Sequence, residues 1–254
     1  MKVSIILPYW ERHDATVEGL RNLIFAYRNG DLDVEIIVVD DGSRDEPARH
    51  AVNEVSIIDN PRGNGPHPPR PRVHLKLVEL PLKDGPLNPC VPINAGVRES
   101  TGDYLLLSNP ETHHRSAILQ AMVEEAERGG PLTYVLAAAF CPETQGWHCH
   151  SVFAKAGYHF CSLLKRSLFD AAGGFDEEYR DGACYDDPDF VERLLKAGAK
   201  FVFRDDLIVD HYKTGASIAW PAPMWERNRD LFFKKWPHRR PTSDVEEARI
   251  QNWS

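Results

Sequence analysis

Two short apolar runs joined by an amphipathic helix constrain the fold of this chain more than any other feature. The first run spans residues 3–7 and stops at Pro8, and the second follows Glu35 within the segment 35–39 and stops at two aspartates. Between them, residues 16–27 place apolar side chains at helical spacing. Runs that are apolar throughout are typical of parallel strands buried on both faces. The three segments therefore predict a strand, helix, strand unit whose acidic end lies at the carboxyl edge of a sheet.

The remaining segments extend this α/β pattern. Further strands are expected at residues 73–80, 104–107, 134–140, 201–203 and 208–209. Further helices are expected at residues 92–100, 116–128, 165–172, 187–197 and 225–236. Residues 60–72 are rich in proline, glycine and basic side chains, which predicts a loop, and residues 141–160 show no clean period. The expected fold class is a single Rossmann-like α/β domain with a mostly parallel central sheet flanked by helices.

Composition argues against several classes of function. With 254 residues and 42% hydrophobic side chains, the chain is large enough to form its own core. Its net charge of -8 argues against a general nucleic-acid binder, which normally carries a basic face. Five cysteines without regular spacing form no disulfide framework and suit a reducing compartment. No apolar run reaches the length of a membrane span, so we expect a soluble cytoplasmic protein, with peripheral membrane contact left open.

Acidic and polar residues gather directly after predicted strands and before one predicted helix. Asp40-Asp41-Gly42-Ser43 and Asn109-Pro110-Glu111 follow strands, and Asp186-Asp187-Pro188-Asp189 opens the helix at 187–197. Each cluster has a plain structural interpretation, because Asp, Gly and Ser are ordinary turn residues and Asp187 before Pro188 is a good helix N-cap. Ligands also bind in loops at the carboxyl edge of a parallel sheet, so the clusters are candidate site residues.

Taken in chain order, these clusters resemble a known family. The segments are Pro8-Tyr9-Trp10-Glu11, Asp40-Asp41-Gly42-Ser43, Asn94-Ala95-Gly96, Gly173-Gly174-Phe175-Asp176 and Tyr185-Asp186-Asp187-Pro188. Together they are similar to the motifs of the inverting nucleotide-sugar glycosyltransferases of family 2, which have the GT-A fold. The resemblance covers residue 3 to about residue 215, with a further match at Lys235-Trp236. It implies a glycosyltransferase domain at residues 1–224, with a nucleotide-sugar-binding half at 1–112 and an acceptor and catalytic half at 113–224, followed by a helix and tail at 225–254.

The resemblance implies a donor site at the ends of the first strands. It assigns the nucleotide-sugar to Pro8, Tyr9, Trp10, Glu11, Asp41, Asn94 and Asn109. An aromatic ring can pack on a sugar or a base, and the Asp41 carboxylate can accept a hydrogen bond from a uracil N–H. A UDP-sugar is therefore the expected donor.

The metal motif of the family departs from its usual form in this chain. The family's Asp-x-Asp reads Asn109-Pro110-Glu111 here, with one carboxylate fewer. Glu111 together with His211 would then hold the divalent metal, Mn²⁺ or Mg²⁺, and the imidazole favours Mn²⁺. Considered alone, His211 is an ordinary core or surface histidine.

The resemblance makes Asp187 the catalytic base, which would take the proton of an acceptor hydroxyl as that hydroxyl attacks the anomeric carbon. The expected acceptor contacts are Trp147, His148, His150 and Asp186. Aromatic rings pack on sugar faces, and imidazoles and carboxylates form hydrogen bonds with hydroxyls. Core packing is an equal alternative for the histidine- and cysteine-rich segment at 141–161, and a zinc site is a weaker one because its spacing fits no standard site.

The expected function is therefore metal-assisted, inverting transfer of a hexosyl group from a nucleotide-sugar donor to a hydroxyl of a glycan or glycolipid, as in polysaccharide biosynthesis. Two alternatives stay open. A catalytically weak or inactive nucleotide- or glycan-binding module of the same fold would fit the altered metal motif. A nucleotidyltransferase shares the strand, loop, helix start, but its first loop is usually glycine-rich and basic, whereas this one reads Pro8-Tyr9-Trp10-Glu11-Arg12. No nucleic-acid partner is expected.

Overall fold

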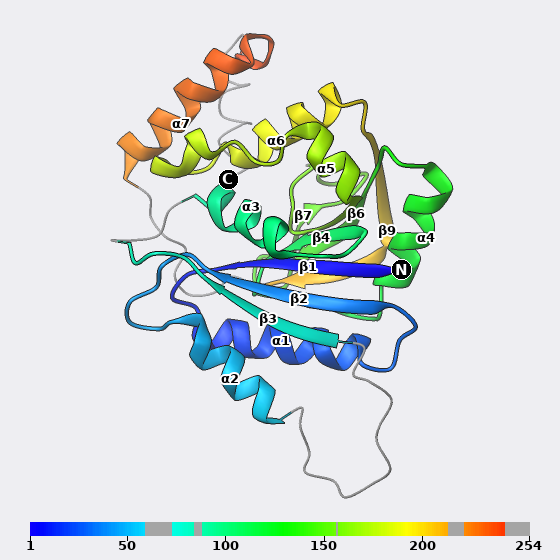
Figure 1. The fold of residues 1–254 in the computed structure, drawn as a ribbon. Helices are drawn as coiled ribbons and strands as arrows, with labels where there is room; N and C mark the ends of the chain where they lie inside the picture. Colours follow the sequence, from blue (N-terminus) through cyan, green and yellow to red (C-terminus); the bar gives the residue numbers. More distant parts are fainter. Residues whose placement is uncertain (59–72, 84–87, 156, 213–220, 242–254) are drawn as a thin grey trace, which may run out of the picture.

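The computed structural model describes residues 1–58, 73–83, 88–155, 157–212 and 221–241. These residues form one sheet with helices on both faces (Figure 1). The strands are β1 (Lys2–Tyr9), β2 (Asp33–Asp40), β3 (Val73–Glu79), β4 (Tyr104–Ser108), β5 (Thr112–His114), β6 (Thr133–Cys141), β7 (Gly146–Cys149), β8 (Cys161–Lys165) and β9 (Lys200–His211). The α-helices are α1 (His13–Tyr27), α2 (Ala48–Ile58), α3 (Cys90–Glu99), α4 (Leu119–Gly129), α5 (Arg166–Ala172), α6 (Asp186–Lys196) and α7 (Ala222–Lys235).

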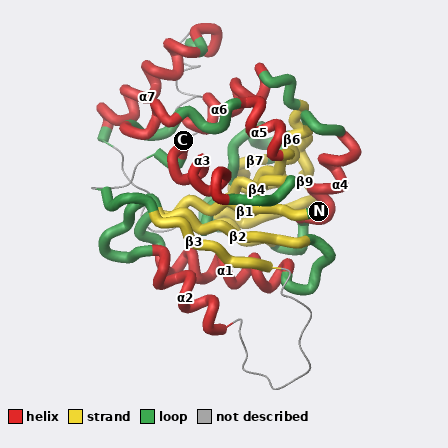
Figure 2. Tube along the Cα trace, in the orientation of Figure 1, coloured by secondary structure: helices red, strands yellow, loops and turns green. Residues whose placement is uncertain are grey.

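The N-terminal half of the sheet is parallel, as the apolar runs predict. The strand order is β3-β2-β1-β4-β8-β6-β9-β5, with β7 paired to β6, and the first four strands run parallel. Helices α1 and α2 lie on one face of these strands and α3 lies on the other (Figure 2). Tyr9 at the end of β1 is in register with Asp40 at the end of β2. The predicted strand, helix, strand unit is confirmed, and its acidic end lies at the carboxyl edge.

The second half of the sheet contains both parallel and antiparallel pairs. The expected mostly parallel arrangement is therefore found only in the first half. β8 runs antiparallel to both β4 and β6, whereas β6 and β9 are parallel. β9 is one strand rather than the two short strands expected, because Ala137 pairs with Arg204 and Ala138 pairs with Ile208. Residues 205–207 therefore bulge out of the pairing, and the charged side chains of Asp205 and Asp206 interrupt the apolar pattern.

A buried carboxylate joins the starts of β1, β2 and β4. The Glu35 side chain accepts hydrogen bonds from the Ser4 hydroxyl and from the backbone N–H groups of Thr101 and Gly102, and it forms an ion pair with Lys2 at 2.9 Å. Burial raises the pKa of Glu35, but the hydrogen bonds outweigh it and lower the pKa to about 2. Glu35 is therefore a charged core residue that stabilises the sheet.

The loop expected at residues 60–72 lies outside the described residues. Among the helices that the structure describes, none combines the length and the apolar character needed to cross a bilayer.

Candidate active site

The chain turns sharply after β1, and the Glu11 carboxylate joins this turn to the loop after β2. Glu11 has a φ of +45°, in the left-handed region. Its carboxylate accepts the backbone N–H groups of residues 44–46. The buried Tyr9 donates its hydroxyl to the carbonyl of Glu46. Both side chains therefore shape the loop after β2, and their contact with a donor stays a prediction.

The two aspartates at the end of β2 differ in their partners. Asp40 accepts the backbone N–H of Ser43 at 2.9 Å and that of Ala48 at 2.8 Å, so it closes the turn and caps α2. Asp41 is also buried, but its carboxylate forms an ion pair with Lys83. Burial raises the pKa of Asp41, and Lys83 opposes that shift. Because Asp41 is held by a side chain rather than by the backbone, it stays the predicted contact to a nucleoside base.

The donor candidates Asn94, Pro8 and Trp10 differ in exposure. Asn94 is buried, donates to the carbonyl of Phe175 at 2.8 Å and accepts the backbone N–H of Phe175 at 3.0 Å. These two bonds hold the glycine-rich loop before α6, so Asn94 acts on the site through that loop. Pro8 and Trp10 are partly exposed at the end of β1 and remain predicted donor contacts.

Glu111 and His211 lie together beside the end of β4. Antiparallel pairing of β5 with β9 places Thr112 opposite His211. As a result, Nε2 of His211 lies 3.7 Å from Oε1 of Glu111 and 3.2 Å from Nδ2 of Asn109. The sheet thus brings together the two predicted metal ligands and the asparagine of the altered motif.

The atoms of this pair fit a divalent cation. Oε1 of Glu111 lies 2.6 Å from Nη1 of Arg12, but Oε2 is buried and has no hydrogen-bond partner among the described residues. Burial lowers the pKa of His211, so its imidazole is neutral at pH 7 and able to bind a metal. No group of three or more His, Cys, Asp or Glu that could hold a metal occurs in the described part of the chain. Oxygens of a bound diphosphate would have to complete the coordination.

Asp187 lies in the first turn of α6 with its side chain 38% exposed, so it can meet a substrate. Its Oδ1 is 3.1 Å from Nε2 of His159, whose side chain is 4% exposed. Burial of the carboxyl group and the nearby charge of Asp186 raise the pKa of Asp187. A raised pKa makes the carboxylate a stronger base than an ordinary aspartate, which suits removal of a proton from a hydroxyl.

The chain reaches Asp187 through two strained residues. Cys184 and Tyr185 have φ values of +57° and +66°, a region that non-glycine residues rarely adopt. α6 begins at Asp186 after Tyr185, with no side-chain cap, so the expected N-cap at Asp187 is wrong. Asn88 donates to the Cys184 carbonyl at 3.0 Å and to Oδ1 of Asp186 at 2.7 Å. Such strain persists only where surrounding contacts hold it.

Asp186, one of the predicted acceptor contacts, is buried and therefore little exposed to an acceptor. Burial raises its pKa to about 6, and the hydrogen bond from Asn88 opposes the rise. Asp186 therefore supports the start of α6, and its charge acts on Asp187 from inside the protein.

The segment before β8 joins the base to the metal pair. His159 contacts Asp187, while the next residue, Phe160, packs its ring on His211 with the centroids 4.7 Å apart. The Phe160 carbonyl accepts the hydroxyls of Ser108 and Thr112, at 3.1 and 3.3 Å, on either side of the altered metal motif. Two consecutive residues thus touch the two functional clusters.

The predicted acceptor contacts on β7 and at His150, directly after it, separate into two groups. The His148 ring lies 5.1 Å from those of His211 and Phe160, beside the metal pair. Trp147 and His150 pack on each other at 4.6 Å and continue a row of rings with Phe140 and Phe153. Only His148 adjoins the candidate site in these contacts, and its role with an acceptor stays a prediction.

The sequence pattern gives no role to Arg12 or His159, which both contact predicted functional residues. Arg12 follows the first strand closely and has a charge that suits Glu111 or a diphosphate, so its position is a usable signal. His159 lies 28 residues before Asp187 in an aperiodic segment, and local spacing carries no sign of their contact.

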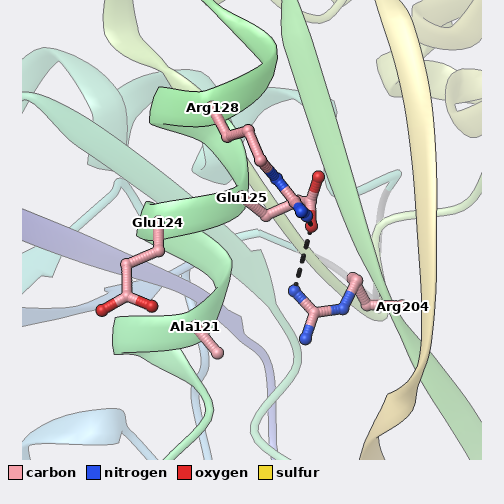
Figure 3. A pocket seen from close by; sticks show the side chains of 5 residues that line it. All are labelled: Ala121, Glu124, Glu125, Arg128 and Arg204. Atoms are coloured by element: carbon pink, nitrogen blue, oxygen red, sulfur yellow. Dashed lines mark hydrogen bonds and ion pairs between the residues drawn. The ribbon is translucent and has the colours of Figure 1, made fainter.

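A separate hollow on α4 and β9 has no catalytic features. It is lined by Ala121, Glu124, Glu125, Arg128 and Arg204 (Figure 3). Nη1 of Arg204 lies 3.1 Å from Oε2 of Glu125, and Arg128 pairs with the same carboxylate. Because these charges neutralise one another, we assign the hollow no function.

The comparison with known sequences finds a glycosyltransferase. No protein-family model matches the chain. Over 134 residues the sequence is 27% identical to undecaprenyl-phosphate 4-deoxy-4-formamido-L-arabinose transferase of Pseudomonas fluorescens (strain Pf0-1), a match that covers 50% of this chain and 33% of the relative. The chain therefore matches about a third of the length of this curated relative.

The comparison with solved structures finds the same fold. The mannosyltransferase PcManGT of Pyrobaculum calidifontis, in complex with GDP-Man and Mn²⁺, matches with a TM-score of 0.62 and 18% identity, over 99% of this chain and 68% of that one. TarS 1-349 of S. aureus, in complex with UDP-GlcNAc, matches with a TM-score of 0.69 and 17% identity, over 98% and 69%. The resemblance indicated by the sequence motifs is thereby confirmed: the chain has the GT-A fold, and half of it is similar in sequence to a glycosyltransferase.

Proposed function

We propose that this chain transfers a sugar from a nucleotide-sugar, of the UDP-sugar class, to a hydroxyl of a glycan or glycolipid, with inversion at the anomeric carbon. The observation that carries the proposal is the contact of consecutive residues with the two functional clusters. His159 touches the carboxylate that would act as base, and Phe160 touches the histidine of the metal pair. A base and a cation site held this close can act on the two sides of one transferred sugar.

The reaction needs one proton acceptor and one stabiliser of the leaving group. As the acceptor oxygen forms its bond to the anomeric carbon, its proton passes to Asp187. The bond between the anomeric carbon and the diphosphate breaks from the opposite side, and its electron pair stays on the phosphate oxygen, which inverts the configuration.

Glu111 and His211 would hold the divalent cation, and Arg12 would add positive charge beside them. When bound, the cation would neutralise the charge that develops on the departing diphosphate. The mannosyltransferase neighbour is in complex with Mn²⁺, which supports metal use in this fold. The nitrogen ligand favours Mn²⁺ over Mg²⁺.

The raised pKa of Asp187 favours a hydroxyl acceptor. The name of the curated relative contains undecaprenyl phosphate, and a phosphate acceptor is already ionised, so it needs no base. A carboxylate with a raised pKa gives an advantage only where a proton has to be removed. The UDP-GlcNAc complex of TarS and the position of Asp41 support a uridine donor.

The test is a donor screen with matched variants. UDP-, GDP- and dTDP-sugars are incubated with Mn²⁺, Mg²⁺ or EDTA and with hydroxyl and lipid-phosphate acceptors, and release of nucleoside diphosphate is measured. We expect turnover with a UDP-sugar and a hydroxyl acceptor, its loss in EDTA, and a fall of roughly 1,000-fold in Asp187→Asn with unchanged donor affinity. Asp181→Asn, at an exposed carboxylate outside the site, is the control.

Two results would contradict the proposal. If Asp187→Asn turns over the hydroxyl acceptor at the wild-type rate, Asp187 is not the base. If a donor binds but no acceptor is glycosylated with either metal, the chain is a binding module of the same fold.

A further inference from the structure

Behind Asp187 lies a second layer of hydrogen-bonding groups. The imidazole of His159 points Nε2 at Asp187, and its Nδ1 is hydrogen-bonded to the hydroxyl of Tyr134. The same hydroxyl lies 2.8 Å from Oγ of Ser162 on β8. All three side chains behind Asp187 are buried. The buried side chains of Ser162, Tyr134 and His159 therefore lie one after another in space, and the last of them adjoins the partly exposed carboxylate of Asp187.

The orientation of the His159 ring is fixed by packing. Phe175 and Phe190 contact it edge to face, with centroids 4.9 and 5.0 Å away, and Tyr134 lies on its third side. A ring confined in this way cannot turn to seek another partner. Nε2 nevertheless has no hydrogen bond of good geometry in the described residues, although Oδ1 of Asp187 is only 3.1 Å away. A small movement of the carboxylate is enough to satisfy the nitrogen.

We propose that His159 is a positioning residue for Asp187: Nε2–H holds Oδ1 and so directs Oδ2 toward the acceptor hydroxyl. This inference rests on the proposed function, since it assigns Asp187 the role of base. His159 exchanges no proton in the reaction. The acceptor proton goes to Oδ2, and the imidazole stays neutral throughout.

The charges around the carboxylate agree with this role. Burial lowers the pKa of His159 to about 3, so the ring is neutral at pH 7. The titratable groups that face Asp187 are Asp186, Cys184, Tyr158, Tyr134 and His159. The cysteine and both tyrosines have raised pKa values and stay neutral, so Asp186 is the one negative charge among these neighbours. The backbone N–H of His159 opposes the effects of burial and of Asp186 on the pKa of Asp187, and an Nε2–H donor would add to that opposition.

The test compares His159→Leu with His159→Gln, whose side-chain amide can still donate to Asp187. We expect His159→Leu to lower kcat roughly 10- to 100-fold with donor KM unchanged. The acidic limb of kcat/KM should move to higher pH by about one unit, because Asp187 loses a donor to its charged form. His159→Gln should recover most of both effects, and Tyr134→Phe should show a smaller loss in the same direction.

The chain offers a matched control, because Tyr27 and His114 form the same kind of buried hydroxyl and imidazole pair away from α6. Tyr27→Phe should leave the pH profile unchanged. The pKa of Asp187, followed by ¹³C NMR of the carboxyl carbon, gives a second readout that needs no turnover.

The outcomes separate the two claims. Activity in Asp187→Asn would contradict the proposed function. Inactivity in Asp187→Asn, combined with wild-type pH profiles and an unchanged Asp187 pKa in both His159 variants, would overturn the role of His159. An equal loss of kcat in His159→Leu and His159→Gln, without a shift of the acidic limb of kcat/KM, would also overturn it.

Discussion

At the scale of single residues, the partners of each carboxylate separate structural acids from candidate catalytic ones. The carboxylates of Asp40 and Glu11 accept backbone N–H groups, so their oxygens are already occupied in stabilising turns. Asp187 contacts one imidazole and keeps more than a third of its side chain exposed. The same residue type thus serves two purposes, and the difference lies in contacts that join distant parts of the chain.

Glu35 gives a prediction about stability and pH. Its pKa is depressed in the folded state, so its contribution is present above the unfolded value of 4.5 and is lost as the pH falls toward about 2. We expect Glu35→Gln to lower the free energy of unfolding at pH 7 by about 2 kcal/mol, because an amide cannot replace a carboxylate that accepts several hydrogen bonds.

Urea unfolding of both proteins at pH 7 and at lower pH measures this difference. The gap between them should narrow as the pH drops below 4.5, since wild-type Glu35 then begins to lose its charge. A gap that stays constant down to pH 2.5 would show that the charge of Glu35 is not what stabilises the sheet.

Residue patterns predicted the strand-end clusters but not all of their roles. The pairing of Glu111 with His211 was expected and is found, whereas the engagement of Glu11 and Tyr9 by the backbone was not. Which polar side chain forms hydrogen bonds with the backbone of a turn depends on loop geometry, and a single sequence does not define that geometry.

At the scale of elements, α7 packs over the strained start of α6. Its aromatic side chains Trp225 and Phe232 contact the ring of Tyr185, each with centroids 5.5 Å apart. The indole Nε1–H of Trp236 donates to Oδ1 of Asp189 at 2.7 Å. The helix expected at residues 225–236 is found, and its packing supports the residues that lead to Asp187.

Asn228 on α7 tests this support. It is fully buried, and its amide donates to the carbonyls of Tyr179 and Cys184, each at 3.0 Å. We expect Asn228→Ala to lower the free energy of unfolding by about 3 kcal/mol, because both carbonyls lose a donor and a cavity forms. Chemical denaturation measures the change, with Gln120→Ala at an exposed position of α4 as control. A loss below about 0.5 kcal/mol would mean that α7 does not hold this turn.

Elements were predictable where their pattern was continuous. The apolar runs of β1, β2 and β4 and the stripes of α1 and α4 were expected near their observed bounds. Helix α2 and the short strands β5, β7 and β8 were missed. β8 lies in a short buried run directly before α5, where strand and helix patterns cannot be told apart.

At the scale of the whole molecule, a ligand that binds between the two halves of the sheet should stabilise the entire fold. Such a ligand would contact Asp41, the predicted partner of the nucleoside base, and the metal pair Glu111 and His211 at the same time. At a concentration 100 times its dissociation constant, UDP with Mn²⁺ would add about 2.7 kcal/mol of stability. For a chain of this size we expect the melting temperature to rise by about 5 to 10 °C.

Differential scanning fluorimetry with UDP, GDP and dTDP, each with Mn²⁺ or EDTA, measures this shift. The rise should be greatest for UDP and should shrink in EDTA and in Glu111→Gln. An equal shift for all three nucleotides would contradict base recognition by Asp41, and an equal shift in EDTA would contradict the metal pair.

The adjacency of His159 and Phe160 also limits how this site could change in length. One peptide unit, about 3.8 Å between Cα atoms, separates the residue behind the base from the residue against the metal pair. Loops elsewhere could lengthen without altering this spacing. A single residue inserted between these two positions would leave either the carboxylate or the cation site aligned with the transferred sugar, but not both.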